Sequence, residues 1–119
     1  MKNLAPQIFR QRLLIEGYTT APVTRETLAA AMTGLAAHLA LRAYAAPVIF
    51  SPGDTGRPGN QGFDAFLPLV DSGISVYYWS SAGFVSILLY TCKGFDETAA
   101  IDYARQAFGI EGEIASASI

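Results

Sequence analysis

Residues 62–92 read GFDAFLPLVDSGISVYYWSSAGFVSILLYTC, and this stretch decides the fold. Two breaks of small residues, Asp71-Ser72-Gly73 and Ser80-Ser81-Ala82-Gly83, divide it into three apolar runs. Short runs rich in β-branched and aromatic residues, bounded by turn-forming residues, are typical of strands. We therefore expect three strands, at about 62–70, 73–79 and 83–92, and the only cysteine of the chain closes the third.

The flanking sequence predicts further strands and two helices. The strands are expected at 12–18, 44–50 and 110–116. One helix begins after Thr24, whose hydroxyl can cap the first turn, and its apolar residues recur every three or four positions to about residue 42. A second helix runs from Asp96 to Phe108, where Gly109 can end it. The order β-α-β-β-β-α-β predicts an α+β two-layer sandwich, a mostly antiparallel sheet with both helices on one face.

Length and composition restrict the class of protein. The chain has 119 residues, which suits a single domain over residues 1–119, with residues 1–10 as a flexible arm. Its eight basic and ten acidic residues are not clustered, which argues against nucleic acid and against a membrane surface as partners. One cysteine cannot form an internal disulfide, which favours a cytoplasmic location. A single histidine and few clustered carboxylates predict no metal site.

The chain is unusually apolar for its length. Its mean hydropathy is +0.29, and a small domain has little interior in which to bury apolar groups. We therefore expect apolar surface to be buried between subunits of a homodimer or other homo-oligomer. Residues 51–61 form a long loop rich in Gly and Pro, which is often functional. Its glycines do not have the spacing of a phosphate-binding loop.

The residues alone leave the chemistry open. Asp71-Ser72-Gly73 makes a good hairpin turn without any catalytic role. Cys92 by itself is typical of a buried core thiol. Strand alternation places Tyr77 and Trp79 on one face and Tyr78 on the other, where they can serve as core or interface aromatics.

The stretch V-D-S-G-I-S-V-Y-Y-W-S-S-A-G-F-V-S-I-L-L-Y-T-C resembles the core of the prokaryotic S-adenosylmethionine decarboxylases. These are small pyruvoyl-dependent enzymes of polyamine biosynthesis, with a motif that runs roughly E-S-H-[hydrophobic]-[ST]-[hydrophobic]-H-T-[WY]-P-E-x-G and a later strand ending T-C-G. The resemblance extends to R-L-L-I-E-G-Y at residues 12–18, to G-F-D-A at 62–65 and to the helix ending A-F-G at 107–109. It covers nearly the whole chain without large gaps.

The resemblance implies a self-processing enzyme. Ser72 would attack the carbonyl of Asp71, and elimination from the resulting ester would cut the chain and leave a pyruvoyl group at the new amino terminus. That group would form a Schiff base with the substrate, S-adenosylmethionine or a related amino acid. Cys92 would donate a proton to the carbanion. Trp79 falls on the aromatic that stacks on adenine, and Phe63 and Ser81 are its candidate partners in substrate binding.

The chain departs from this family pattern at several positions. The histidine after the serine is Gly73, and the second motif histidine is Tyr77. The serine of the G-V-S-G motif is Asp64, and Ser80-Ser81 replaces the P-E whose carboxylate grips the ribose. Asp64 and Tyr77 would therefore have to supply the base and the oxyanion donor.

Two alternatives remain open at this stage. The chain can be an unprocessed, non-catalytic paralogue that binds a nucleoside-like ligand or regulates an active homologue, because both motif histidines are absent. It can also run a different reaction on the same fold with Asp64, Tyr77 and Cys92 and no pyruvoyl group.

Overall fold

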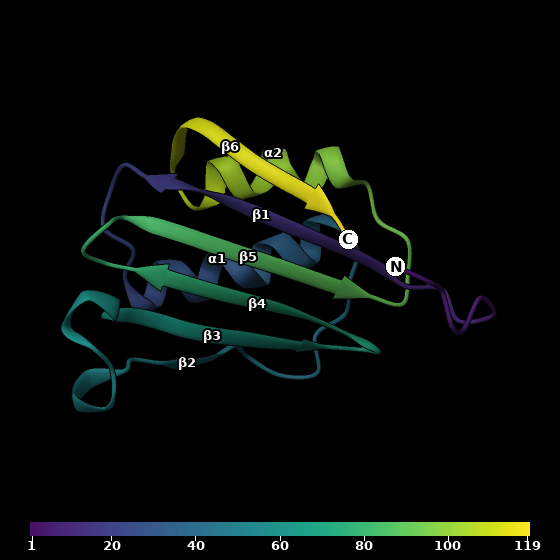
Figure 1. The fold of residues 1–119 in the computed structure, drawn as a ribbon, viewed down its shortest axis with the longest axis horizontal. Coiled ribbons are helices and arrows are strands. Elements are labelled where there is room, and N and C mark those ends of the chain that lie inside the picture. The colour runs from purple at the N-terminus through teal and green to yellow at the C-terminus, as the bar shows by residue number, and fades with distance from the viewer.

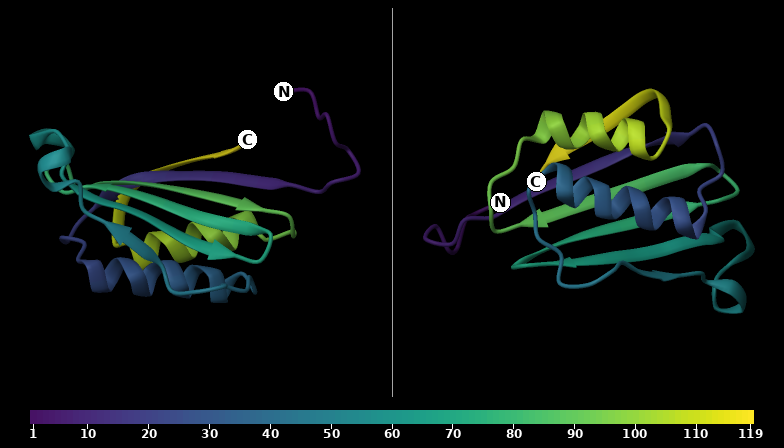
Figure 2. Two further views of the ribbon diagram at one scale, coloured as in Figure 1. Left: turned by 90° about the horizontal axis from the view of Figure 1, so that it is seen from below. Right: turned by 180° about the vertical axis from the view of Figure 1, so that it is seen from behind.

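A computed structural model describes residues 1–119 as one six-stranded antiparallel sheet with two helices packed on one of its faces (Figures 1 and 2). The strands are β1 (Gln11–Thr19), β2 (Val48–Phe50), β3 (Gly62–Leu69), β4 (Ser72–Trp79), β5 (Phe84–Thr91) and β6 (Ile110–Ser118), and the helices are α1 (Arg25–His38) and α2 (Glu97–Ala107). The strand order across the sheet is β2-β3-β4-β5-β1-β6. The predicted α+β two-layer sandwich is confirmed, and neither helix is long and apolar enough to span a membrane.

Strand alternation gives the sheet one covered and one open face. Alternate residues of β4 and β5, such as Ile74, Val76 and Ile87, are fully buried under the helices. The opposite face has no layer over it (Figure 2, left), although it carries many large apolar side chains. Those that are at least two-fifths exposed on this face are Tyr18, Val48, Phe50, Phe66, Tyr77 and Tyr90.

Both helices begin with the caps that the sequence predicts. Thr24 accepts a hydrogen bond from the backbone N–H of Thr27, whose hydroxyl accepts in return from the N–H of Thr24. Asp96 accepts from the N–H of Ala99 in the same way. Gly109 follows α2 with a φ of 65°, which glycine adopts without steric cost.

Helix α1 is shorter than its apolar spacing predicts, because it ends in a left-handed cap. Ala40 has a φ of 57°, and the N–H of Leu41 donates to the carbonyl of Ala36 across the cap. This geometry reverses the chain while it keeps Leu39 and Leu41 buried. Apolar periodicity therefore continues past the helix, and the prediction of a helix to residue 42 is wrong.

Two strand predictions also need correction. Only Val48–Phe50 of the expected 44–50 strand forms a ladder with β3, while Tyr44 makes a single backbone hydrogen bond to the carbonyl of Pro68. Pro47, which lacks a backbone donor, precedes the paired residues. The turn between β3 and β4 is Val70–Asp71 rather than 71–73. Asp71 adopts a φ of 55°, and Ser72 already pairs with Leu69 as the first residue of β4.

Candidate active site

The Asp71–Ser72 peptide bond lies at the end of a tight hairpin. Asp71 is one of two non-glycine residues in the chain with a positive φ, a conformation that Asp tolerates better than most residues. The turn is held from outside, since the N–H of Val70 donates to the carbonyl of Arg42 at 2.8 Å. Backbone strain at such a bond costs on the order of 1 kcal/mol or more and is often found at functional sites.

Ser72 and Cys92 meet across the ends of β4 and β5. The Oγ of Ser72 accepts a hydrogen bond from the backbone N–H of Cys92 at 3.2 Å. Cys92 follows β5 directly and is exposed, so the buried core thiol is not what the structure contains. The structure thus brings together the two residues that the family resemblance pairs.

Two hollows flank the Asp71–Ser72 bond. One, of about 200 Å³, is lined by Asp71, Cys92 and two cationic residues, Arg42 and Lys93. Lys93 Nζ donates to the carbonyl of Ala40 at 3.0 Å, which ties this hollow to the end of α1. Two cations beside a thiol favour an anionic ligand group, such as a carboxylate.

The second hollow, of about 350 Å³, opens on the uncovered sheet face and contains Ser72, Phe66 and Tyr90 in its wall. Gly73 also lines this hollow, and the ring of Phe66 occupies the space that a side chain at this position would need. A Cβ at Gly73 would lie 2.6 Å from the ring of Phe66. A histidine at position 73, as in the family motif, would therefore clash with the ring of Phe66.

The other predicted catalytic and binding residues gather at the opposite end of β4. Asp64 on β3 lies directly opposite Tyr77 on β4, and both are exposed on the open face. Trp79 lies two residues further on the same face and tilts against Phe84, with ring centroids 5.5 Å apart. Asp64 and Trp79 both line a third hollow, of about 430 Å³.

The two groups of residues do not meet within one chain. Ser72 and Tyr77 are five positions apart on β4, which corresponds to roughly 16 Å at about 3.3 Å per residue. The side chains of Asp64 and Tyr77 are too short to cross that distance. The structure therefore assembles Ser72 with Cys92, and Asp64 with Tyr77 and Trp79, as two separate clusters.

Three further residues, Phe63, Ser81 and His38, contact other parts of the chain and not the Ser72 hairpin. Phe63 points to the helix-covered face, where its ring stacks on Tyr78 at 6.4 Å and under the guanidinium of Arg25 at 5.5 Å, so it does not join Trp79. Ser81 Oγ donates to the carbonyl of Gly59 at 3.3 Å and anchors the 51–61 loop. The single histidine, His38, stacks on Tyr103 between the helices and lines neither hollow beside Ser72.

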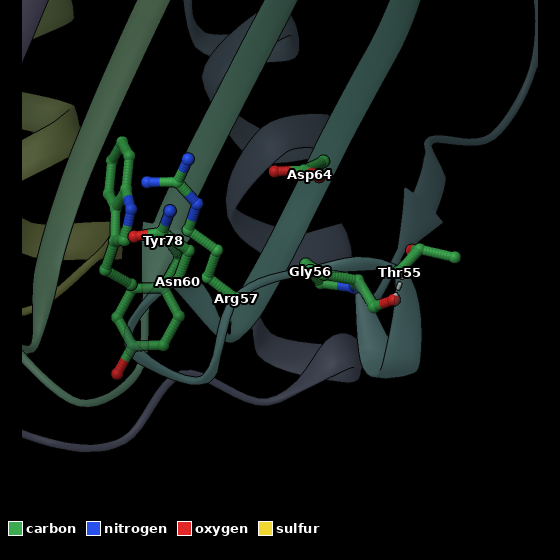
Figure 3. Close-up of a pocket in the computed structure, with 8 residues that line it drawn as sticks. Thr55, Gly56, Arg57, Asn60, Asp64 and Tyr78 are labelled. Atoms are coloured by element: carbon green, nitrogen blue, oxygen red, sulfur yellow. Dashed lines mark hydrogen bonds between the residues drawn. The ribbon is translucent and has the colours of Figure 1, made fainter.

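Sequence reasoning missed the side chains that the loops contribute. Arg57 and Asn60 of the 51–61 loop line the hollow beside Trp79, and Arg42 and Lys93 line the one beside Cys92. The 51–61 loop has no periodic pattern, and Arg42 and Lys93 lie just outside the regular elements, so the sequence carries no signal for the direction of these side chains. The length and glycine content of the 51–61 loop predicted a functional loop but did not indicate that Arg57 and Asn60 line a hollow (Figure 3).

Comparison with known proteins agrees with the geometry. A family model described as S-adenosylmethionine decarboxylase matches residues 12–117. Among solved structures, the adenosylmethionine decarboxylase of Aquifex aeolicus VF5 superposes with a TM-score of 0.72 at 18% identity, over 94% of this chain and 89% of that one. No curated protein matches the chain.

Proposed function

Because the chain belongs to the S-adenosylmethionine decarboxylase family, we propose that it decarboxylates S-adenosylmethionine or a related amino acid through a pyruvoyl group made from Ser72. The observation that carries this proposal is the contact between Ser72 Oγ and the backbone of Cys92 beside the strained Asp71 turn. The proposal includes a cytoplasmic location and a role in polyamine synthesis.

The residues at the hairpin fit the self-cleavage that such a group requires. Ser72 Oγ attacks the carbonyl carbon of Asp71, and the peptide nitrogen of Ser72 leaves that carbon as an amine, so that an ester replaces the amide. Loss of the Ser72 Cα proton then breaks the ester bond, and Asp71 becomes a free carboxyl terminus. Water replaces the nitrogen of the dehydroalanine that remains, and ammonia is released.

The pyruvoyl carbonyl supplies an electrophile that condenses with an amine and accepts electrons as carbon dioxide leaves. The neighbouring residues have separate tasks. Arg42 and Lys93 attract the substrate carboxylate to the hollow beside the turn. The exposed thiol of Cys92 is available to return a proton to the substrate carbon. No metal is needed for these steps.

Intact mass of the purified protein tests the proposal. We expect two fragments, residues 1–71 and residues 72–119, the second with a ketone in place of its amino terminus. Borohydride in the presence of substrate should add the mass of the amine product or substrate to the second fragment only. One uncut chain under native conditions contradicts the proposal.

We further propose that the catalytic unit is a homodimer in which the open sheet faces pack together. The reason is the distance between the two clusters, because a twofold axis that lies between the two open faces and runs across the strands would bring Asp64 and Tyr77 of one copy to the Ser72 end of β4 in the other. The exposed aromatic residues of this face supply the apolar surface that such an interface needs. Sheets stacked this way lie about 10 Å apart, close enough for side chains from both to meet.

Mixing two inactive variants tests the shared site. Ser72→Ala cannot be cut, and a chain with both Asp64→Asn and Tyr77→Phe should be cut slowly when expressed alone. In equal co-expression, about half of the double-variant chains pair with a Ser72→Ala chain, and we expect that half to be cleaved. Intact mass measures the fraction, and the protein should elute as a dimer. A monomer, or a double variant that stays uncut in the mixture, contradicts the dimer proposal.

The absence of an imidazole near Ser72 favours one second candidate, an unprocessed binding or regulatory paralogue. His38 is held between the helices by Tyr103, so proton transfer at the hairpin falls to a carboxylate or a phenol. The mass measurement separates the two functions. If the chain stays uncut, copurification with an active decarboxylase becomes the test of a regulatory role.

A further inference from the structure

Residues 1–10 form an amino-terminal hook that leaves the sheet at the start of β1. Asn3 Oδ1 accepts hydrogen bonds from the backbone N–H of Ala5, at 3.0 Å, and from the guanidinium of Arg10. The N–H of Ile8 donates to the carbonyl of Ala5 at 2.9 Å, which closes the turn. In Figure 2 (left) the hook rises on the side of the sheet away from the helices, which is the open face. The hook therefore extends toward whatever covers that face.

The hook carries apolar and positively charged groups that its own chain does not cover. Met1, Leu4 and Ile8 are each at least half exposed. Lys2 and Arg10 are its only charged side chains, so the hook is purely cationic together with its terminal amine. A segment of this composition is complementary to an apolar surface with carboxylates beside it.

The far end of β1 has such a surface. Tyr18 is 61% exposed there, and its ring tilts against that of Phe84 with the centroids 5.3 Å apart. Beside Tyr18, the ladder between β1 and β6 is interrupted, and residues 111–113 of β6 lie between two paired positions. These residues, Glu-Gly-Glu, form an acidic bulge in which both carboxylates are exposed. Bulges of this kind redirect side chains at the edge of a sheet.

The acidic bulge is held in place by its backbone and not by its charges. Arg105 on α2 donates to the carbonyl of Gly112 at 3.0 Å and to that of Ile110 at 3.4 Å. No ion pair within the chain joins Glu111 or Glu113 to a cation. Two unpaired carboxylates thus lie beside an exposed aromatic ring at a corner of the sheet.

The twofold axis of the proposed dimer brings the hook of one copy to the acidic bulge of the other. The axis crosses β4 midway between its two clusters, and the strand register carries that line across β1 between Leu13 and Leu14. Residues 8–10 precede this point by as many positions as residues 17–19 follow it. The base of the hook in one copy therefore lies level with Tyr18 in the other. Stacked sheets lie about 10 Å apart, a gap that a hook rising from the open face can span.

We propose that the amino-terminal hook of each copy clasps the acidic bulge of a second copy of this chain. Ile8 packs on Tyr18 of the other copy, and Arg10 pairs with the two glutamates of its bulge. The inference rests on the homodimer proposed above and adds a separate contact to it. Since a twofold dimer makes every contact twice, two such clasps hold the ends of the paired sheets together. The clasp gives a role to the cationic hook and the acidic bulge, which no step of the proposed reaction uses.

Disulfide trapping tests the contact between copies. In a background of Ser72→Ala and Cys92→Ser, which is uncut and has no other thiol, a chain with Ile8→Cys is co-expressed with a chain with Tyr18→Cys. Mild oxidation of the purified mixture should join about half of the chains in pairs, as measured by intact mass without reductant. Residues 11–18 alone extend roughly 23 Å along β1, so this disulfide cannot form within one chain. Asp102→Cys, exposed on α2 in the helix layer, should form no bond with Ile8→Cys.

Charge reversal tests the ion pairs. Arg10→Glu and Glu113→Arg should each raise the Kd of the dimer at least about tenfold, because each change replaces two attractive contacts by repulsive ones. The chain with both changes should return to within about threefold of the native Kd. Asp102→Arg makes the same change on the helix layer and should leave the Kd unchanged. Sedimentation equilibrium measures all four variants.

The clasp and the dimer fail in different ways. A dimer that forms no disulfide between positions 8 and 18, or whose Kd neither reversal changes, contradicts the clasp and leaves the packing of the open faces intact. Losses that add up in the doubly reversed chain show that Arg10 does not pair with the acidic bulge. A native chain that sediments as a monomer contradicts both proposals. None of these measurements depends on cleavage at Ser72.

Discussion

Replacing Ser72 by alanine is expected to leave a single uncut chain and to lower decarboxylation by a factor on the order of 10³ or more. The hydroxyl is both the nucleophile of the proposed cleavage and the source of the carbonyl, so no other residue can supply the missing electrophile. The folded state loses only the hydrogen bond to the N–H of Cys92, which contributes about 1 kcal/mol. Intact mass and turnover of the purified variant measure the two effects.

Two matched variants give this prediction its specificity. Ser116→Ala makes the same chemical change on β6, away from the hairpin, and should be cut and active as the native chain is. Cys92→Ser should be cut but turn over slowly, because it removes the proton donor and keeps the nucleophile. Native turnover in Ser72→Ala would show that the chemistry of this chain does not pass through a pyruvoyl group.

Replacing Gly62 by alanine is expected to destabilise the fold by about 2–4 kcal/mol, the largest stability effect that we predict for a single methyl group. Gly62 opens β3 with a φ of 149°, and a Cβ there would lie 1.8 Å from the carbonyl oxygen of Tyr78. Since that oxygen belongs to the backbone of β4, either the strand or the loop has to move. For a domain of this length we expect the melting temperature to fall by roughly 10 °C.

Gly59 provides the matched control inside the same loop. A Cβ added at this position would have no atom within 4 Å, and the residue has no positive φ, so Gly59→Ala should change stability by less than about 0.5 kcal/mol. Thermal unfolding followed by circular dichroism compares the two variants directly. Equal melting temperatures would mean that the close approach between β3 and β4 at Gly62 does not constrain the chain.

The sequence was sufficient for most of the fold because its signals are local. Alternating apolar residues and the caps at Thr24 and Asp96 depend on neighbours in the chain, and the structure confirms the strands and helices that they predict. The errors arose where a local signal was overridden. Leu39 and Leu41 continue the apolar period of α1 although they lie in its cap, and Asp71 accepts a conformation that moves the turn by one residue.

The candidate site was only partly predictable, for a different reason. Ser72 and Cys92 are twenty residues apart, and the register of β4 and β5 that joins them follows from the strand pattern. The separation of Asp64 and Tyr77 from that pair depends on where each strand begins, which no pattern of residue types specifies. Arg57 lines the hollow beside Trp79 because of the loop conformation, which hydrogen bonds from Gln61 and Ser80 hold in place.

The position of β1 between β5 and β6 sets the order of events during synthesis. The strand is made first, yet both of its neighbours come from the last third of the chain. Contacts of such long sequence separation form late, so the sheet cannot close until β6 has been synthesised. A cut at residue 71 in the closed sheet would leave two pieces that both contribute strands to it. The two pieces would remain associated, because β1 of the first piece is hydrogen-bonded between β5 and β6 of the second.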